Sequence, residues 1–303
     1  MEHIDLGTGI ELCYEWRGAP GDPVVVLIAG LGRQLIGWDD SFCQLLVDEG
    51  FSVLRFDNRD TGLSTHLEGG PPFDLAAARA GGREAVAYTL DDMADDTAGL
   101  LDALGIERAH IVGTSMGGMI AQTLAIAHPA RVRSLCSIMS TTGADDAGRS
   151  TPEAMAVVMQ RPATDRETYV STELANSAVI GSRGSLVDES WRRRRFESFF
   201  DRGIDASGTA RQIMAIVASG DRTAGLAGIT VPTLVIHGDV DPLITLPGGE
   251  ATARAISGAV LVVIPDMGHE IPPAVQSTIV EAIAGNARRA DEASAPGAQR
   301  SHR

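Results

Sequence analysis

The chain has 303 residues, 44% of them hydrophobic, which is enough for one large α/β domain with a sizeable core. Its formal net charge is −15 and all 25 basic residues are arginine, so no basic stripe favours nucleic acid or an anionic membrane surface as a partner. The first residues lack the apolar stretch of a signal peptide, no apolar run approaches a membrane span, and the three cysteines lack metal-ligand spacing, so we expect a soluble cytoplasmic protein without a metal.

Strand-like and helix-like segments alternate through the first 141 residues. The predicted strands are 2–6, 10–16, 24–28, 52–56, 109–112 and 133–139. The predicted helices are 38–48, 90–104 and 119–127. Residues 65–88 form a long loop rich in Gly, Pro and Ala, of the kind often found at the mouth of a site. The alternation predicts a mostly parallel sheet with helices on both faces.

The segment between the fifth strand and its helix carries a nucleophile motif. Residues 113–117 read Gly-Thr-Ser-Met-Gly, a Gly-x-Ser-x-Gly pattern in the strand, sharp turn and helix context of a nucleophile elbow. The flanking glycines suit a serine held in a strained backbone conformation with no side chains crowding it. We therefore expect Ser115 to present its hydroxyl to a substrate.

The alternation stops at about residue 142. Residues 142–208 show no convincing strand and several helix-like pieces, including 152–160 and 186–202, which predicts a helical cap, or lid, over the strand ends. Alternation resumes in a second core segment, so the core comprises 1–141 and 209–285. Its predicted elements are strands 233–237 and 260–264 and helices near 247–256 and 272–288. The polar, Ala-rich residues 286–303 are expected to be disordered.

Two strands of the second segment are followed by candidates for an acid and a base. A serine hydroxyl needs a histidine oriented by a carboxylate, and with this elbow the chain order is Ser, then acid, then His. Asp239 and Asp241 follow strand 233–237, and His269 follows strand 260–264. We favour Asp241, because the proline after it fixes the turn. Asp239 stays an alternative.

Other side chains fit these roles less well. Asp145 and Asp146 follow an earlier strand and are a weaker source of the acid. His110 and His237 fall within or at the end of strands, where a structural role is expected, and the remaining histidines are expected on loops or the surface.

A developing oxyanion needs two backbone N–H donors. One is expected from Met116, the residue after the nucleophile. The other is expected from the turn after strand 24–28, Ala29 to Gly32, where we assign Leu31. The alternative interpretation of this Gly-rich turn is tight packing alone.

With these motifs in place, residues 10–285 resemble the α/β-hydrolase superfamily. The stretch 56–64, Phe-Asp-Asn-Arg-Asp-Thr-Gly-Leu-Ser, carries an Arg-Asp-Thr-Gly-x-Ser version similar to that of the aclacinomycin methylesterases, which hydrolyse a methyl ester on an anthracycline. The pair Gly37-Trp38 and the strand 233–236 are also similar. The resemblance implies a triad of Ser115, Asp241 and His269 with oxyanion donors Leu31 and Met116. Asp60 stands where many members of the superfamily have a glycine. Two departures stand out: Ala29-Gly30 replaces the His-Gly of many relatives, and the resemblance carries over least to the cap.

We therefore expect a serine hydrolase that cleaves a carboxylic ester of a small molecule through an acyl-enzyme, without a cofactor. The resemblance points to the methyl ester of a bulky acid. The same triad could serve C–C bond, lactone or thioester hydrolysis, or perhydrolysis. A non-catalytic relative would usually lose a triad member. A dehydrogenase fingerprint is suggested by Gly30-x-Gly32 and Asp57, but Leu35 replaces its third glycine.

Four arginines in a row, residues 192–195, lie on a predicted cap helix. Consecutive residues cannot share one helix face, so the expected arrangement is a solvated surface balanced by Glu189 and Glu197. The sharper hypothesis is that one arginine binds an acidic substrate. The cap, 142–208, is the suspected source of substrate-binding residues.

Overall fold

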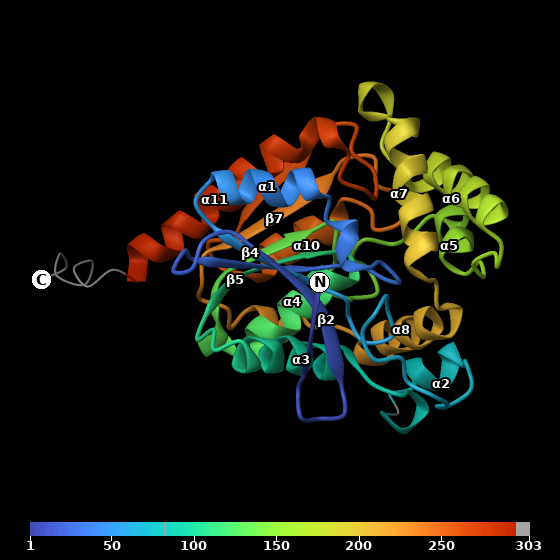
Figure 1. Ribbon diagram of the computed structural model, residues 1–303, viewed down its shortest axis with the longest axis horizontal. Helices are drawn as coiled ribbons and strands as arrows, with labels where there is room; N and C mark the ends of the chain where they lie inside the picture. The colour runs from blue at the N-terminus through green and yellow to red at the C-terminus, as the bar shows by residue number, and fades with distance from the viewer. Residues whose placement is uncertain (82, 295–303) are drawn as a thin grey trace, which may run out of the picture.

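The computed structural model describes residues 1–81 and 83–294. Within them, eight strands form one sheet in the order β1-β2-β4-β3-β5-β6-β7-β8 (Figure 1). β1 and β2 join antiparallel, and the other strands run parallel from β4 to β8. The bounds are β1 (Glu2–Asp5), β2 (Glu11–Arg17), β3 (Val24–Ile28), β4 (Ser52–Phe56), β5 (Ala109–Thr114), β6 (Val132–Ile138), β7 (Thr233–Gly238) and β8 (Val260–Ile264).

The apolar run of β3 is buried on both faces of the sheet. Val26 and Ile28 belong to one core cluster, whereas Val25 and Leu27 belong to the other, because successive side chains of a strand point to opposite faces. Helices α1 (Asp40–Asp48) and α11 (Pro273–Ser294) cover the second cluster. Helices α3 (Leu90–Ala103), α4 (Met116–Ala127) and α10 (Pro247–Ala255) cover the first. Figure 1 shows α1 beside α11 over one face and α3 on the opposite side.

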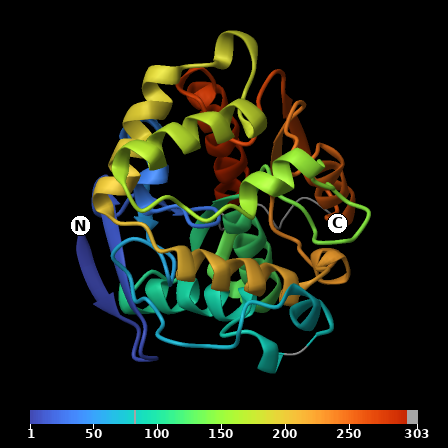
Figure 2. The same ribbon diagram turned by 90° about the vertical axis from the view of Figure 1, so that its right-hand side faces the viewer.

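A run of helices separates β6 from β7. They are α5 (Pro152–Val158), α6 (Arg166–Ile180), α7 (Glu189–Arg202), α8 (Ala206–Ser219) and α9 (Thr223–Leu226). Figure 1 shows α5 to α8 together at one end of the molecule, and Figure 2 looks onto them. α6 and α7 share a small apolar cluster of their own, around Tyr169 and Phe199. α8 instead packs partly on the core, through Ala215.

The remaining short elements lie in connections. They are the 3₁₀ turns η1 (Leu35–Gly37), η2 (Arg83–Ala85), η3 (Pro129–Arg131) and η4 (Gly184–Leu186), and the helix α2 (Leu75–Arg79). The expected loop 65–88 therefore contains local structure. The Asp74 carboxylate caps α2, and Ala78 packs with Met214 of α8.

The expectation of a disordered tail from residue 286 is wrong for residues 286–294, because α11 continues to Ser294. Packing explains the extension: Asn286 donates hydrogen bonds to the carbonyls of Leu135 and Pro232, and Asp291 pairs with Arg133 at 3.0 Å. Residues 295–303 lie outside the described residues. In the described part of the chain, no helix is both long and apolar enough to cross a membrane.

Candidate active site

Ser115 occupies a strained turn between β5 and α4. Its φ is 54° and its ψ is −121°, a conformation that side chains rarely adopt and that costs on the order of 1–3 kcal/mol. The two glycines of the motif make the turn sterically feasible. A Cβ on Gly113 would lie 2.0 Å from the Gly117 carbonyl oxygen, and one on Gly117 would lie 2.1 Å from the Ile28 oxygen. The elbow helix thus starts directly against the end of β3.

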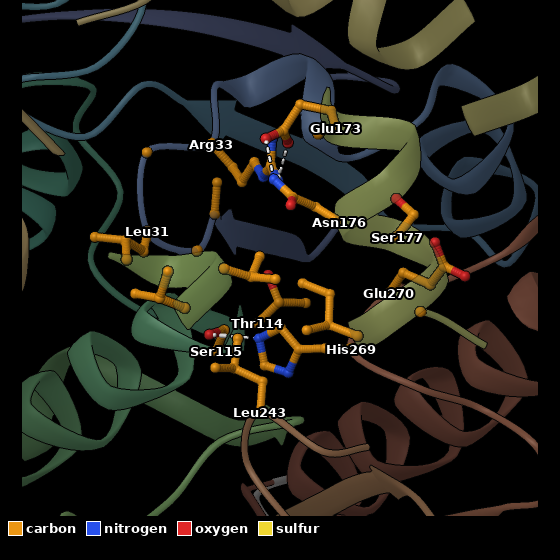
Figure 3. Close-up of a pocket in the computed structure, with 18 of the residues that line it drawn as sticks. Leu31, Arg33, Thr114, Ser115, Glu173, Asn176, Ser177, Leu243, His269 and Glu270 are labelled. Atoms are coloured by element: carbon orange, nitrogen blue, oxygen red, sulfur yellow. Dashed lines mark hydrogen bonds and ion pairs between the residues drawn. The ribbon is translucent and has the colours of Figure 1, made fainter. Parts of the chain in front are cut away.

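Three side chains from distant segments form one hydrogen-bonded series. His269 Nε2 lies 2.9 Å from Ser115 Oγ, and His269 Nδ1 lies 2.7 Å from Asp241 Oδ2. The Asp241 side chain is fully buried, and its other oxygen accepts hydrogen bonds from the backbone N–H groups of Leu243 and Ile244 at 2.8 and 3.0 Å. Figure 3 shows the serine hydroxyl facing the imidazole ring. With Nδ1–H donating to Asp241, Nε2 is left to accept the serine proton.

The alternative acids lie elsewhere. Asp239 is exposed, and its carboxylate accepts from the backbone N–H of Asp266 at 2.8 Å. Asp145 is on the surface and pairs with Arg79. The structure therefore brings Asp241, and not Asp239, to His269. His237, also beside Asp241, is buried and contacts the Ile244 carbonyl at 2.7 Å, and burial lowers its pKa.

The turn after β3 packs against the serine. A Cβ on Gly30 would lie 3.3 Å from Ser115 Cβ. The N–H of Gly32 is used by Gln212, whereas no described residue accepts from the N–H of Leu31. Met116 is the first residue of α4, where an N–H has no acceptor within the helix. Neither N–H group therefore has an acceptor among the described residues, and the assignment of Leu31 and Met116 as oxyanion donors stays a prediction.

Gln212 is a supporting residue that sequence reasoning missed. Its side chain is fully buried on α8, and its Oε1 accepts from Gly32 N at 2.8 Å. Its Nε2 donates to the Arg59 carbonyl at 2.9 Å and to Thr61 Oγ1 at 2.8 Å. Both polar atoms of this amide are thus engaged: Oε1 holds the turn that carries Leu31, and Nε2 holds the segment after β4. The sequence gives one sign of this role: Gln212 is a polar residue on the same face of the helix as the buried Ala215.

Ser115 and His269 open into a cavity of about 330 Å³, within the size range of small-molecule sites (Figure 3). Its wall combines core residues with residues of α6 and α7. Apolar and aromatic lining residues include Trp38, Met119, Tyr169, Ile180, Trp191, Phe196, Ile216, Leu243 and Ile271. The cavity therefore has a largely apolar lining beside Ser115 and His269.

The expected solvated arginine run is wrong for two of its four members. Arg193 and Arg194 are exposed, but Arg192 is only 6% exposed and its guanidinium binds both oxygens of Glu270. Arg195 lines the cavity. Residues three apart share a helix face, so Arg192 and Arg195 point inward together with Trp191 and Phe199 while their neighbours point out.

Asp60, the residue that replaces a glycine, has a positive φ of 65°. Its buried carboxylate accepts hydrogen bonds from Arg211 through both oxygens, at 2.8 and 2.7 Å, from Tyr88 Oη at 2.7 Å and from Leu67 N at 2.7 Å. These four contacts stabilise an aspartate where the backbone favours glycine. Burial, with the nearby Asp60 carboxylate, raises the pKa of Tyr88.

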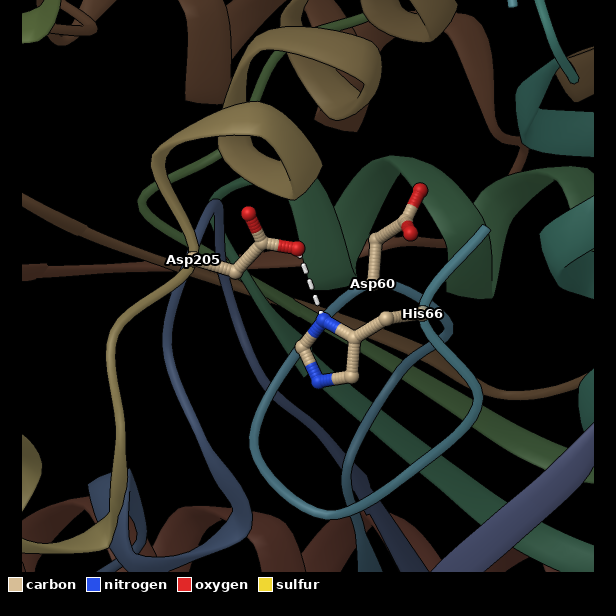
Figure 4. A group of neighbouring side chains, drawn as sticks. All are labelled: Asp60, His66 and Asp205. Atoms are coloured by element: carbon tan, nitrogen blue, oxygen red, sulfur yellow. Dashed lines mark hydrogen bonds and ion pairs between the residues drawn. The ribbon is translucent and has the colours of Figure 1, made fainter. Parts of the chain in front are cut away.

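His66 and Asp205 lie next to Asp60 (Figure 4). The three ligand atoms are close enough to hold a metal ion, but the lone pairs of Asp60 are already engaged by Arg211 and its other partners. His66 Nδ1 lies 2.7 Å from Asp205, and Nε2 lies 3.0 Å from the Gly62 carbonyl. Burial disfavours the charged form, but these hydrogen bonds outweigh it and raise the pKa of His66. The group connects the loop after β4 to the start of α8.

Comparison with known proteins decides the family. Residues 23–272 match the family described as alpha/beta hydrolase fold. The chain belongs to this α/β-hydrolase family. It is 30% identical to "Rhodomycin D methylesterase DauP" of Streptomyces sp. (strain C5) and 28% identical to "Rhodomycin D methylesterase DnrP" of Streptomyces peucetius, each over 93% of this chain and 96% of the relative. A solved hydrolase from Pseudomonas aeruginosa PA01 has a TM-score of 0.70 at 27% identity, covering 95% of this chain and 97% of its own.

In this α/β hydrolase, the Gly30-x-Gly32 turn does not open a helix as a dinucleotide fingerprint would. It leads to the 3₁₀ turn η1 and lies against Ser115 and Gln212. The carboxylate of Asp57 accepts from the backbone N–H groups of Leu35 and Leu63 and pairs with Arg202 at 2.6 Å. Both features of the suspected fingerprint therefore have roles within the hydrolase fold.

Proposed function

We propose that this protein is a serine hydrolase that cleaves a carboxylic ester, and that its substrates are methyl esters of bulky acids. The observation that carries the proposal is the hydrogen-bonded series from Asp241 through His269 to Ser115 at the wall of a cavity. The similarity to two proteins named as methylesterases supports the choice of ester.

In the proposed mechanism, His269 removes the proton of Ser115 as Oγ attacks the carbonyl carbon. The resulting oxyanion is held by the N–H groups of Leu31 and Met116. His269 then protonates the leaving alcohol, and an acyl-enzyme remains on Ser115. Water activated by His269 releases the acid.

Asp241 acts through His269 in this mechanism. Its buried carboxylate keeps the Nδ1–H tautomer in place and stabilises the imidazolium that forms after proton transfer. The backbone N–H groups of Leu243 and Ile244 hold the carboxylate itself, so little reorganisation accompanies the charge change.

The form of the cavity supports the substrate assignment. A methyl group needs little space, so most of the largely apolar cavity of about 330 Å³ is left for the acid part. Apolar and aromatic residues from α6 and α7 would cover that part once it is bound.

Labelling with a fluorophosphonate probe tests the enzyme claim first. We expect labelling of the native protein, loss of labelling in Ser115→Ala, and unchanged labelling in Ser257→Ala, an exposed serine used as a matched control. A Ser115→Ala protein that still reacts with the probe would contradict the proposal.

A substrate panel then tests the choice of ester. It compares p-nitrophenyl esters of rising chain length with methyl esters of bulky acids. Higher kcat/KM for bulky acyl groups is the expected result, and a preference for acetyl esters would contradict the substrate assignment.

A further inference from the structure

Two arginines lie close together where α7 packs against the core. Arg33 follows the turn that carries Leu31, and Arg195 comes from α7. Their guanidinium carbons lie 5.3 and 5.4 Å from the centroid of the same ring, that of Phe199. A Cβ placed on Gly37 would contact Arg195, Arg33 and Phe199 at 3.6 to 3.7 Å. Both arginines line the cavity that holds Ser115.

Arg33 has one close counter-charge. Its Nη2 donates to Glu173 at 2.9 Å (Figure 3), and the second oxygen of Glu173 accepts from Asn176 at 3.1 Å. Burial disfavours the charged guanidinium, but Glu173 outweighs this effect and raises the pKa of Arg33. Both oxygens of Glu173 thus have partners on its own side of the cavity, and no ion pair between Glu173 and Arg195 is found among the described residues.

The positive charge of Arg195 is neutralised less completely by its neighbours. It lies 3.5 Å from Asp39 and donates to the Gly37 carbonyl at 2.7 Å. The other oxygen of Asp39 is taken by Trp191 Nε1 at 2.7 Å and by Gln276 Nε2 at 2.9 Å. Two of the five N–H donors of this guanidinium have acceptors among the described residues, so donors remain for a ligand.

The pKa of Arg195 also indicates that its charge is incompletely neutralised. Burial lowers the pKa of Arg195, because Asp39 offsets the loss of hydration incompletely and Arg33 adds repulsion. The guanidinium stays charged at neutral pH. An anion in the cavity would relieve both the lost hydration and the repulsion between the two arginines.

Arg192 shows how a structural arginine on the same helix differs. Its guanidinium bonds both oxygens of Glu270 and the Ser182 carbonyl, which ties α7 to the segment after His269. Arg195 makes no comparable closed pair. Stacking on Trp191 and Phe199 fixes its position, at 5.0 and 5.4 Å from the ring centroids, without neutralising it.

We propose that Arg33 and Arg195 bind a carboxylate carried by the acid part of the substrate. This inference rests on the proposed ester hydrolysis. A methyl alcohol part has no room for a charge, so the anion belongs to the acyl part. The substrate class is then a half-ester, the monomethyl ester of a dicarboxylic acid.

A pair of matched esters tests the inference: the p-nitrophenyl monoester of glutaric acid, which is anionic, and p-nitrophenyl hexanoate, which is neutral and of similar length. The readout is the ratio of the two kcat/KM values, which cancels differences in the amount of active protein. We expect the native ratio to exceed one. In Arg195→Met it should fall about 10- to 100-fold, the range for losing a charged hydrogen-bonding partner.

Further variants sharpen the test. Arg194→Met, at an exposed position next to Arg195, should keep the native ratio. Arg195→Lys, which keeps the charge but not the planar fork, should give an intermediate ratio and also serves if the methionine variant does not fold. Arg33→Met should lower the ratio as well.

Two results would overturn the inference: a native ratio of one or less, or the same ratio in native protein and Arg195→Met. Neither result affects the proposed function, which fails separately if neither ester is hydrolysed and Ser115 is not labelled.

Discussion

The sheet edge and the helices between β6 and β7 contribute to the same cavity in different ways. The sheet supplies Ser115, Asp241 and His269 from the ends of β5, β7 and β8, of which β5 and β7 are buried and β8 is a partly exposed edge strand. The helices supply Arg195 and a ring of aromatic side chains, and they are tied to the core by ion pairs and hydrogen bonds such as Arg192–Glu270. The part that carries the proposed chemistry is thus fixed by the core. The helices that line the rest of the cavity are attached to the core both through polar contacts such as this ion pair and through apolar packing of α8.

The largest expected effect is a loss of catalytic rate that leaves the folded structure unchanged. Ser115→Ala should lower kcat by about 10⁴-fold or more without unfolding the protein, and His269→Ala should act similarly. The proposed mechanism makes the two residues one unit, so the double variant should lower kcat little more than either change alone. Steady-state kinetics with circular dichroism checks this, and multiplicative losses would contradict a shared unit.

The next effect concerns the ion pair between Arg192 and Glu270, which links α7 to the core. Arg192→Met leaves the Glu270 carboxylate, 12% exposed, without its cation and should lower the free energy of unfolding by about 3 kcal/mol. Urea denaturation measures this. Arg193→Met, exposed on the same helix, is the control and should change stability by less than about 0.5 kcal/mol. Equal losses in the two variants would mean that the ion pair does not hold α7.

A smaller effect is expected where α8 supports the core. Gln212→Met removes the acceptor of Gly32 N–H and loosens the turn that carries Leu31, so kcat should fall about 10-fold, less than for deletion of an oxyanion donor. KM should change less, because the turn acts on the transition state. Gln44→Met, on the exposed face of α1, is the matched control. A change confined to KM would exclude the positioning role.

The smallest effect is pH-dependent. The folded pKa of His66 is raised, so its stabilising contribution is fully present below the unfolded value of about 6.5 and is lost as pH rises through the folded pKa. His66→Asn should therefore lose more stability at about pH 5.5 than at about pH 8.5, by under about 1 kcal/mol at this half-exposed site. Thermal unfolding at both pH values measures the difference. A loss that is the same at both would contradict it.

Local patterns predicted the core well. The apolar runs 24–28 and 52–56 are the strands β3 and β4, and the family is confirmed. The motifs around Ser115, Asp241 and His269 could be located because each follows a strand, and parallel strands end at one edge of a sheet. The structure places these three side chains in contact, and their catalytic roles stay a prediction.

Features that depend on tertiary contacts could not be predicted from the sequence. α6 buries Tyr169, Val170, Asn176 and Ser177 on one face, and because two of these four are polar the hydrophobic pattern did not reveal the helix. α11 runs beyond residue 285 because Asn286 and Asp291 find partners on the loop before β7 and on β6. The inward turn of Arg192 could not be foreseen either, because Glu270 is 78 residues away.

The aspartate at position 60 has a consequence for engineering. Its fully buried carboxylate depends on Arg211, a residue of α8, and the neighbouring His66–Asp205 contact joins the same two segments. A chimera that replaced this helical region with that of a relative would leave the buried carboxylate without its cation unless the arginine were kept. Positions 60, 66, 205 and 211 should therefore be exchanged as one block, with glycine at 60 whenever the donor lacks the arginine.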